Sequence, residues 1–335
     1  MNPIRPLFLV AALIAGCSAC SLVAGQAEGV SPSSPPAVHL SYTETLKDQE
    51  SLRSQRFSSG TDYSTDPAIS LQRPSSVFAD AFRVYVVDQN PAPRVFVFNR
   101  NERTAAPLNI PAAPTEGKLL NPTGIAVDAS NVIYVADGPQ GKVFGFDRTG
   151  TLVLVFGKAG MFVYPSAVAV DRHRDRVYIA DSQDHLVKAF SGSGQLLFEL
   201  RGEGTAKGGF KNPAGIAVDA EGRIHVLDTQ ARRVVLFGPD GAFLSAFSLG
   251  HRDGGGGNQP QGIAVDREGR VYVSDGTTNN IFIYGPDGTL IESWGKTGIV
   301  QGDFWSPRGL FIDDRDLLYI ADQNNGRVQV YQIMP

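Results

Sequence analysis

One short pattern recurs six times in this chain and constrains its fold more than any other feature. In each copy a Pro is followed six residues later by an Asp, and the copies start at Pro74, Pro122, Pro165, Pro213, Pro260 and Pro307. The intervals between successive prolines are 48, 43, 48, 47 and 47 residues. Self-similarity at a nearly fixed period of this length indicates a repeat architecture, in which each copy forms one supersecondary unit.

The copies have the pattern of short β-strands, four in each of the first five copies and three in the sixth. Their apolar runs are four to seven residues long, are rich in Val, Ile, Phe and Tyr, and are separated by Gly, Asp, Asn or Pro, which is typical of strands and turns. The first run ends at the Asp of the pattern, as in NPTGIAVD, and the second ends at another Asp, as in VIYVAD. A third run follows in every copy and a fourth in the first five. Four short strands per period of about 47 residues predict a propeller blade.

The sixth copy stops after its third run, at residues 328–331. A ring of blades must close, because an unpaired strand edge is exposed to further pairing. Residues 37–45 (AVHLSYTET) alternate roughly between apolar and polar and can supply the missing strand. We therefore expect an all-β, six-bladed β-propeller of four-stranded blades over residues 37–335, with the last blade closed by an N-terminal strand. Residues 46–70 are polar and would form an excursion before the first blade.

The repeat resembles the NHL repeat. The resemblance rests on the core Pro-x-Gly-Ile-Ala-Val-Asp, which recurs in register as NPTGIAVD, NPAGIAVD and QPQGIAVD, and the six copies cover nearly all of residues 70–335. WD repeats need recurring Trp-Asp dipeptides and kelch repeats need recurring Gly pairs, and neither recurs here. The layout of the whole chain is similar to that of bacterial NHL-repeat lipoproteins, which implies a binding scaffold.

The N-terminus carries the features of an export signal. Arg5 precedes an apolar run over residues 7–14, and this pattern is typical of a secretory signal peptide, here residues 1–16. The run is too short to span a bilayer, which needs about 20 residues. It ends in LIAGC, which resembles a bacterial lipobox, so we expect Cys17 to be acylated and to become the first mature residue. An ordinary cleaved signal peptide is the alternative.

The lipobox resemblance also predicts where the protein resides. Residues 17–36 would form a lipidated tether, because their second half is rich in Pro, Ser and Gly and has almost no apolar content. Ser18 is not the Asp that often retains lipoproteins at the inner membrane. The resemblance therefore favours the outer membrane in a host that has one.

Composition excludes several kinds of site from the predicted propeller. Cys17 and Cys20 are the only two cysteines, so a disulfide framework, a Cys-ligated metal and a Cys nucleophile are excluded there. The formal net charge of −4 gives no electrostatic reason to bind nucleic acid. No serine-hydrolase elbow or phosphate-binding loop occurs in a suitable context. The five histidines occupy five different repeat positions, which argues against a three-His zinc site: His39, His173, His185, His225 and His251.

Two sets of Asp residues recur in the copies. We interpret the Asp that ends the first strand as the start of a turn into the second. The resemblance implies that the Asp ending the second strand pairs with the residue opening the third, and these pairs are Asp88–Arg94, Asp137–Lys142, Asp228–Arg233 and Asp322–Arg327. Copies three and five depart from this pattern, with Leu186 and Asn280 at the basic position. We interpret the pairs as structural, each contributing at most about 1 kcal/mol near a surface.

The turns between the second and third strands form a polar, amide-rich set at the end where the blades are connected. Amide and hydroxyl groups suit hydrogen bonding to a protein backbone or a glycan, although turns are also polar because they are solvated. The candidate binding residues are Gln140, Gln183, Asp184, His185, Arg232, Asn279 and Asn324.

Together these features favour a non-catalytic protein-interaction scaffold. We expect an exported, monomeric propeller that is lipid-anchored to a membrane and presents one face to an envelope or surface protein. On this hypothesis there is no catalytic residue, no metal ligand, no cofactor and no nucleic-acid partner. The alternative is a metal-dependent lyase or hydrolase with its site at the mouth of the propeller channel. Only that alternative requires a bound Ca or Zn ion.

Overall fold

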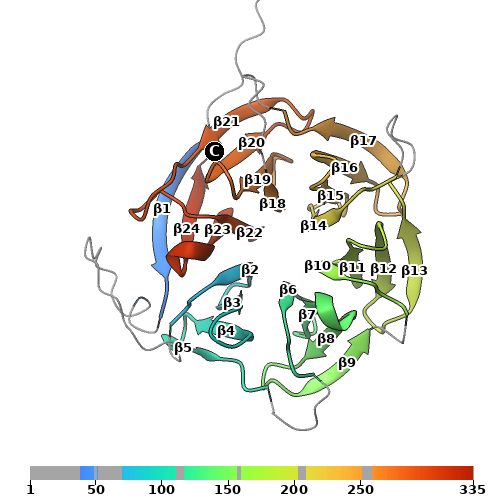
Figure 1. Ribbon diagram of the computed structural model, residues 1–335, viewed down its shortest axis with the longest axis horizontal. Coiled ribbons are helices and arrows are strands. Elements are labelled where there is room, and N and C mark those ends of the chain that lie inside the picture. The colour runs from blue at the N-terminus through green and yellow to red at the C-terminus, as the bar shows by residue number, and fades with distance from the viewer. Residues whose placement is uncertain are drawn as a thin grey trace, which may run out of the picture. The chain divides into compact units, whose positions relative to one another are not determined.

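In the computed structural model, six four-stranded antiparallel sheets form a ring around a central axis (Figure 1). The structure describes residues 38–48, 51, 70–110, 117–156, 160–202, 209–250 and 259–334. Each sheet is one blade, and in five blades the strands lie in chain order from the axis outward. The predicted all-β, six-bladed propeller of four-stranded blades is therefore confirmed.

The strands follow the repeat pattern. The innermost strands, each starting at the repeat Pro, are β2 (Pro74–Ala79), β6 (Pro122–Val127), β10 (Pro165–Asp171), β14 (Pro213–Val218), β18 (Pro260–Val265) and β22 (Pro307–Ile312). The second strands, each ending at an Asp, are β3 (Arg83–Asp88), β7 (Ile133–Asp137), β11 (Arg176–Asp181), β15 (Ile224–Asp228), β19 (Val271–Asp275) and β23 (Leu317–Asp322).

The outer half of each blade is built in the same way. The third strands are β4 (Arg94–Asn99), β8 (Lys142–Phe146), β12 (Leu186–Ser191), β16 (Arg233–Phe237), β20 (Asn280–Tyr284) and β24 (Arg327–Met334). The outermost strands are β5 (Thr104–Pro107), β9 (Leu152–Phe156), β13 (Leu196–Leu200), β17 (Phe243–Ser248), β21 (Leu290–Trp294) and β1 (His39–Leu46). Two short 3-10 helices, η1 (Gly138–Gln140) and η2 (Gln323–Asn325), lie between the second and third strands of blades two and six.

The last blade is closed by the N-terminal strand, as predicted. In Figure 1 the blue strand β1 lies outside the red strand β24, and the two pair antiparallel from His39 opposite Met334 to Leu46 opposite Val328. The strand spans residues 39–46 rather than 37–45. Glu44 of β1 also forms an ion pair with Arg100 of blade one. Closure therefore links the first and last blades through side chains as well as through the backbone.

The Asp at the end of each innermost strand starts the turn into the second strand. In blade four, Oδ1 of Asp219 accepts hydrogen bonds from the backbone N–H groups of Glu221 and Arg223, at 3.1 and 2.8 Å. These bonds fix an Asx turn, as the sequence predicted. In four blades, the Oδ2 atom of this Asp accepts a second kind of hydrogen bond, from an aromatic side chain of the second strand at 2.9–3.0 Å. The donors are the hydroxyls of Tyr134, Tyr272 and Tyr319 and the imidazole of His225.

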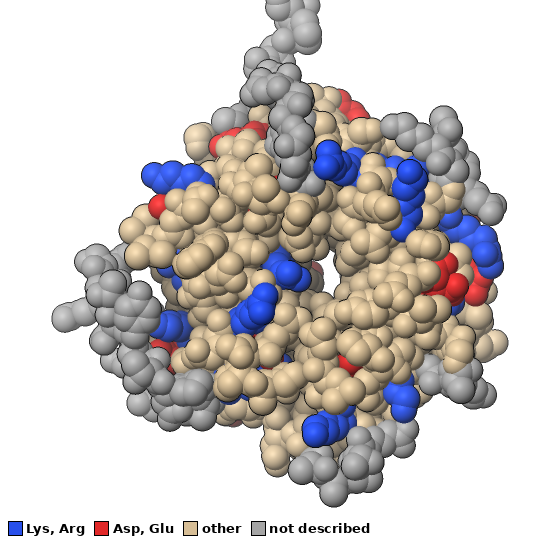
Figure 2. Space-filling view, viewed as in Figure 1, with Lys and Arg blue, Asp and Glu red and all other residues tan. Residues whose placement is uncertain are grey.

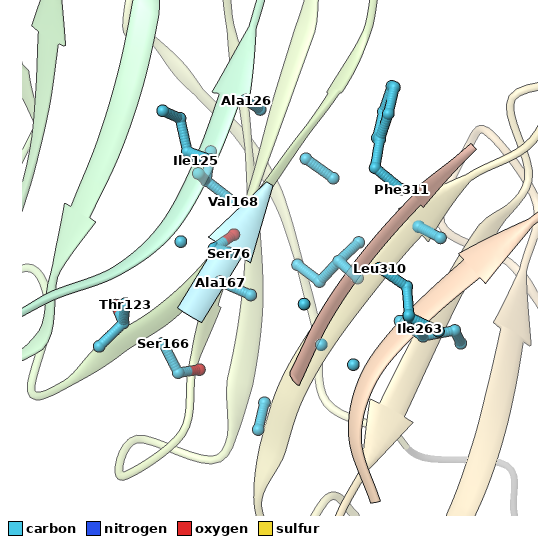
Figure 3. A pocket seen from close by; sticks show the side chains of 18 of the residues that line it. Ser76, Thr123, Ile125, Ala126, Ser166, Ala167, Val168, Ile263, Leu310 and Phe311 are labelled. Atoms are coloured by element: carbon cyan, nitrogen blue, oxygen red, sulfur yellow. The ribbon is translucent and has the colours of Figure 1, made fainter. Parts of the chain in front are cut away.

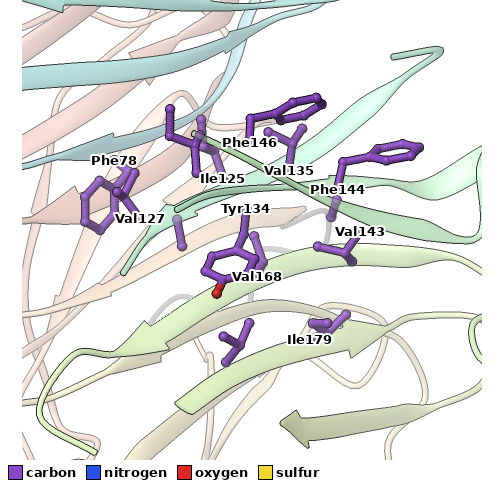
Figure 4. Packing of buried hydrophobic residues seen from close by; sticks show 14 of the residues in the cluster. Phe78, Ile125, Val127, Tyr134, Val135, Val143, Phe144, Phe146, Val168 and Ile179 are labelled. Carbon is purple, nitrogen blue, oxygen red and sulfur yellow. The ribbon is translucent and has the colours of Figure 1, made fainter. Parts of the chain in front are cut away.

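Neighbouring blades pack closely along their innermost strands. A Cβ atom on Gly309 of β22 would lie 2.7 Å from Ser76 Cα and 2.8 Å from Ser75 O of β2, so only glycine fits there. Outside this contact the blades bury apolar side chains against each other. Figure 4 shows this packing for blade two, where Tyr134 lies near Val168 of blade three. The result is a rigid ring with its loops at two ends.

Candidate functional site

A cavity of about 350 Å³ runs along the propeller axis between the innermost strands of all six blades. Its two ends differ in chemistry because each innermost strand starts with a Pro and a variable residue and ends with apolar residues. The end at the repeat prolines is lined by polar side chains that include Gln89, Tyr164 and Asn212. The opposite end is lined by the apolar side chains of Phe78, Phe311 and Ile312. Figure 3 shows Thr123 and Ser166 at one end of the cavity and Phe311 at the other. We call the polar end the channel mouth.

The residue that follows the repeat Pro decides the chemistry of the channel mouth. At this position the six blades carry Ser75, Thr123, Ser166, Ala214, Gln261 and Arg308, and all of them line the cavity. The Thr123 hydroxyl donates to Pro165 O at 2.9 Å, and the Ser166 hydroxyl donates to Pro213 O at 3.1 Å. Both bonds cross to the next blade. The Ser75 hydroxyl is buried and has no hydrogen-bond partner among the described residues.

Arg308 places a cation at the channel mouth. Within the described part of the chain, its buried Nε atom has no hydrogen-bond partner, and its guanidinium forms no ion pair with a carboxylate. Burial lowers the pKa of the guanidinium, and the nearby charge of Arg73 lowers it further. The sequence analysis missed this residue. The available signal was that the position after the repeat Pro varies while its neighbours recur.

The face around the channel mouth contains the predicted binding residues, and they divide into two groups. The side chains of Gln183, His185, Arg232 and Asn324 are exposed. The other predicted side chains make hydrogen bonds within the fold. Gln140 donates to Lys118 O at 2.8 Å, and Asn279 donates to Thr297 Oγ1 at 2.7 Å.

Asp184 belongs to this second group, because it lies 2.6 Å from Lys188 Nζ. The exposed group therefore offers hydrogen-bonding atoms to a partner, whereas the bonded group shapes the turns.

The predicted Asp–Arg pairs lie within contact distance in three blades. The nitrogen–oxygen distances are 2.8 Å for Arg94–Asp88, 3.2 Å for Arg233–Asp228 and 2.8 Å for Arg327–Asp322. In blade two, Asp137 lies opposite Lys142 in the strand register, and Gln140 Nε2 donates to Asp137 Oδ2 at 3.0 Å.

These aspartates are fully buried, so the expectation of pairs near the surface was wrong. Each Asp also caps one or two backbone N–H groups just before the repeat Pro of its own blade. Asp228, for example, accepts from Lys211 and Asn212 at 3.0 and 2.9 Å. Burial raises the pKa of Asp322, although the charge of Arg327 opposes this shift.

Blade three replaces the missing Arg with Lys188. Its Nζ lies 3.3 Å from Asp181 Oδ2 and donates to Met161 O at 2.7 Å. Lys188 follows Leu186 by two residues, so both side chains are on the same face of β12, and the longer one reaches the Asp. In blade five, Asp275 instead accepts bonds from the backbone N–H groups of Thr277 and Thr278, both at 2.9 Å.

Three of the six blades carry an exposed apolar side chain at one repeat position, just before the channel mouth. Leu120, Val163 and Trp305 each precede a repeat Pro by two residues, and each is about half exposed. Ile299 and Val300 are exposed in the same inter-blade connection as Trp305. Large exposed apolar side chains beside polar ones are typical of a protein interface. Sequence reasoning missed this set because it considered only the turns between the second and third strands.

Several predicted features lie outside the described residues, namely residues 1–16, the tether at residues 17–36 with Cys17, and His251. Within the described ranges, no group of three or more His, Cys, Asp or Glu side chains is arranged to hold a metal ion. In the same ranges no helix is long and apolar enough to cross a bilayer.

Comparison with known proteins identifies the repeat. The model of the NHL repeat matches residues 258–284 and 304–331, which fall in blades five and six. The chain is similar to Protein brain tumor from Drosophila melanogaster, with 32% identity over 113 residues. This match covers 32% of the chain and 10% of the length of that protein.

Solved structures share the fold at low identity. Virginiamycin B lyase from Staphylococcus aureus is 12% identical, with a TM-score of 0.57 over 81% of this chain and 83% of that one. A gluconolactonase from Xanthomonas campestris is 15% identical, with a TM-score of 0.58 over 90% and 99%. An auxiliary nutrient binding protein from Bacteroides thetaiotaomicron is 10% identical, with a TM-score of 0.63 over 89% and 77%. The chain is a six-bladed β-propeller that carries NHL repeats.

Proposed function

We propose that this protein is a non-catalytic binding module, exported and held at a membrane through Cys17, that presents the face around its channel mouth to a protein of the cell envelope. The observation that carries the proposal is the set of exposed apolar side chains on this face. Trp305 is 51% exposed, and its backbone O accepts a hydrogen bond from the N–H of Asn324, whose side chain is also exposed. Aromatic anchors within a polar rim are the usual centre of binding energy in a protein interface.

The fold supports recognition by this face. The inter-blade connections that hold Leu120, Val163 and Trp305 are tied to the blades by buried Asp residues: Asp137 accepts from the Leu120 N–H at 2.6 Å and Asp322 from the Trp305 N–H at 2.8 Å. The apolar side chains are therefore held on fixed backbone before a partner arrives. A preorganised surface loses less conformational entropy on binding.

Capture of the partner from native membranes tests the proposal. Mild crosslinking, detergent extraction through a C-terminal tag and mass spectrometry should recover one stoichiometric envelope protein. Trp305→Ala should lower the recovery at least tenfold, because truncating a hot-spot aromatic costs 2 kcal/mol or more. Phe82→Ala is the matched control, since Phe82 is 52% exposed but lies in a turn at the opposite end of the blade. Equal loss with both variants, or no partner at all, would contradict the proposal.

The membrane anchor has its own test. Cys17→Ser should release the mature protein from the membrane fraction and abolish metabolic labelling with a fatty acid, because the thiol is the acylation site. Cys20→Ser is the control and should leave both unchanged. If Cys17→Ser stays in the membrane fraction as the control does, the anchor is not at Cys17. A purified chain that retains stoichiometric Ca or Zn would instead support the metal-dependent lyase or hydrolase.

A further inference from the structure

The seam between blades six and one brings two side chains together at the channel mouth. Strands β22 and β2 are in such close contact that Gly309 has no room for a Cβ atom against Ser75 and Ser76. Arg308 and Ser75 occupy the same repeat position on these two strands, and both line the cavity. This seam therefore concentrates donors on one side of the channel mouth.

Three buried polar atoms of these two blades have no partner among the described residues. They are Ser75 Oγ, Arg308 Nε and Gln323 Nε2 of η2, and η2 contacts both β2 and β22. Ser75 is 7% exposed and Gln323 is 1% exposed. Folded proteins satisfy nearly all buried polar groups. Ser75 and Arg308 line the cavity, so a molecule bound there can complete the hydrogen bonds of their two atoms.

The charge at this seam selects an anion. Arg308 has no carboxylate partner within the described ranges, and the charge of Arg73 repels it. Figure 2 shows Lys and Arg atoms beside the central opening, over β2 and β22. Without an opposite charge, a half-buried guanidinium is costly. An anion at the channel mouth would neutralise this charge and accept the free hydrogen bonds.

We propose that the channel mouth at this seam binds the carboxylate of a small organic acid, with Arg308 as the main contact and the Ser75 hydroxyl as a donor. The planar guanidinium fork matches a carboxylate in a bidentate geometry. Gln261 and Tyr164 line the same mouth and can bind polar substituents, and the Phe78–Phe311 pair, with ring centroids 4.5 Å apart, receives an apolar body. A cavity of about 350 Å³ lies within the range of small-molecule sites.

Titration of the full chain with small acids tests this site independently of any protein partner. Acetate, lactate and succinate are the probes, and succinamide and inorganic phosphate are the comparison compounds, all at matched ionic strength. We expect saturable binding of at least one carboxylate by calorimetry, a matching rise in the unfolding temperature, and no response to succinamide. Saturation by phosphate with equal affinity, or no saturation by any of the carboxylates, would overturn the proposal.

Matched Arg variants locate the site. Arg308→Met should lower carboxylate affinity at least tenfold, whereas Arg232→Met should leave it unchanged, because Arg232 is an exposed cation on the same face that does not line the cavity. Arg308→Gln provides a second variant that keeps a polar side chain and loses only the charge. Circular dichroism confirms that each variant is folded. Parent affinity in both Arg308 variants would overturn the assignment.

Discussion

The two seams that flank blade three differ from the seam between blades six and one. At all three seams the residue that follows the repeat Pro lies at the boundary between the blades. Thr123 and Ser166 donate hydroxyl hydrogen bonds across their seams to the next blade. The Ser75 hydroxyl has no such partner in the described structure, and Arg308 beside it is equally unpaired. The same position therefore stabilises the ring at some seams and is left available to a ligand at another.

The basic residues show the same contrast. Arg233 is 5% exposed and donates to Asp228 and, at 2.8 Å, to Gly209 O. Arg308 is half-buried and carries its charge without a carboxylate partner among the described residues. A buried ion pair is part of the fold, because removal of one partner leaves the other uncompensated. An unpaired cation contributes nothing comparable to stability, so its presence suggests another role.

The largest effect is expected at the paired cation. Arg233→Met should lower the free energy of unfolding by about 3–5 kcal/mol, because the fully buried Asp228 carboxylate loses its counter-charge. Equilibrium denaturation in guanidinium chloride measures the change. Arg232→Met, the exposed neighbour, should change stability by less than about 0.5 kcal/mol. Equal losses in the two variants would show that the buried pair is not what distinguishes them.

A smaller effect is expected where blade four differs from its neighbours. His225 Nε2 lies 2.9 Å from Asp219 Oδ2, in the position that Tyr occupies in the other five blades. The Tyr hydroxyl donates to the corresponding Asp in blades two, five and six. His225→Phe should lower the free energy of unfolding by about 1–3 kcal/mol, because the buried Asp219 loses a hydrogen-bond partner. His225→Tyr should preserve or raise it, because the His225 Nδ1 atom is buried without a described partner and Tyr has no such atom. Thermal unfolding of both variants is the measurement. An equal loss of stability in His225→Tyr and His225→Phe would contradict this account.

The seam comparison itself predicts a change of about 1 kcal/mol. Thr123→Val removes the hydroxyl that bonds Pro165 O and keeps the shape of the side chain, so the free energy of unfolding should fall by about 1 kcal/mol. Urea denaturation is the measurement. No change in midpoint would mean that the bond across this seam adds nothing to the stability of the ring.

The smallest expected effect is the change in stability at low pH that comes from Asp219. Burial alone would raise the pKa of Asp219, but hydrogen bonds from His225 and Arg223 outweigh burial and leave the pKa lowered. A carboxylate whose pKa is lowered by folding stabilises the protein above its unfolded pKa of about 3.9, and this contribution is lost as the pH falls through the lower folded value.

The stability difference between the parent and Asp219→Asn should therefore shrink below about pH 4. Acid titration of the unfolding free energy gives this difference. Asp314→Asn, at an exposed side chain, is the control for the loss of one carboxylate. A difference that grows as the pH falls would reverse the sign and contradict the account.

Sequence reasoning recovered the architecture because the repeats carry it. The period, the strand pattern and the missing last strand together predict six blades closed by residues 37–45, and β1 spans residues 39–46. Local turn chemistry was equally readable at the Asp residues that end the innermost strands. The burial of the Asp–Arg pairs was not readable, because burial depends on how the inter-blade connections cover the ends of the strands.

The candidate site was only partly predictable. The turns between the second and third strands lie at the end of the propeller that holds the channel mouth. The side chains of Gln140, Asp184 and Asn279, however, make internal bonds that depend on tertiary contacts. Lys188 was missed because it acts from two residues beyond the expected position. The Arg308–Ser75 seam was missed because the two residues lie 233 positions apart and meet only when the ring closes.

One measurement tests the central claim most directly. The claim is that the polar groups at the seam between blades six and one are not needed for the stability of the ring. The double variant Ser75→Ala with Arg308→Met removes a hydroxyl and a guanidinium at the channel mouth that have no partner among the described residues. Without added carboxylate, its free energy of unfolding should equal or exceed that of the parent, because an unpaired buried polar group is a cost to the fold. A loss of more than about 1 kcal/mol, as expected for Thr123→Val, would show that these groups hold the ring together like their counterparts in the other blades.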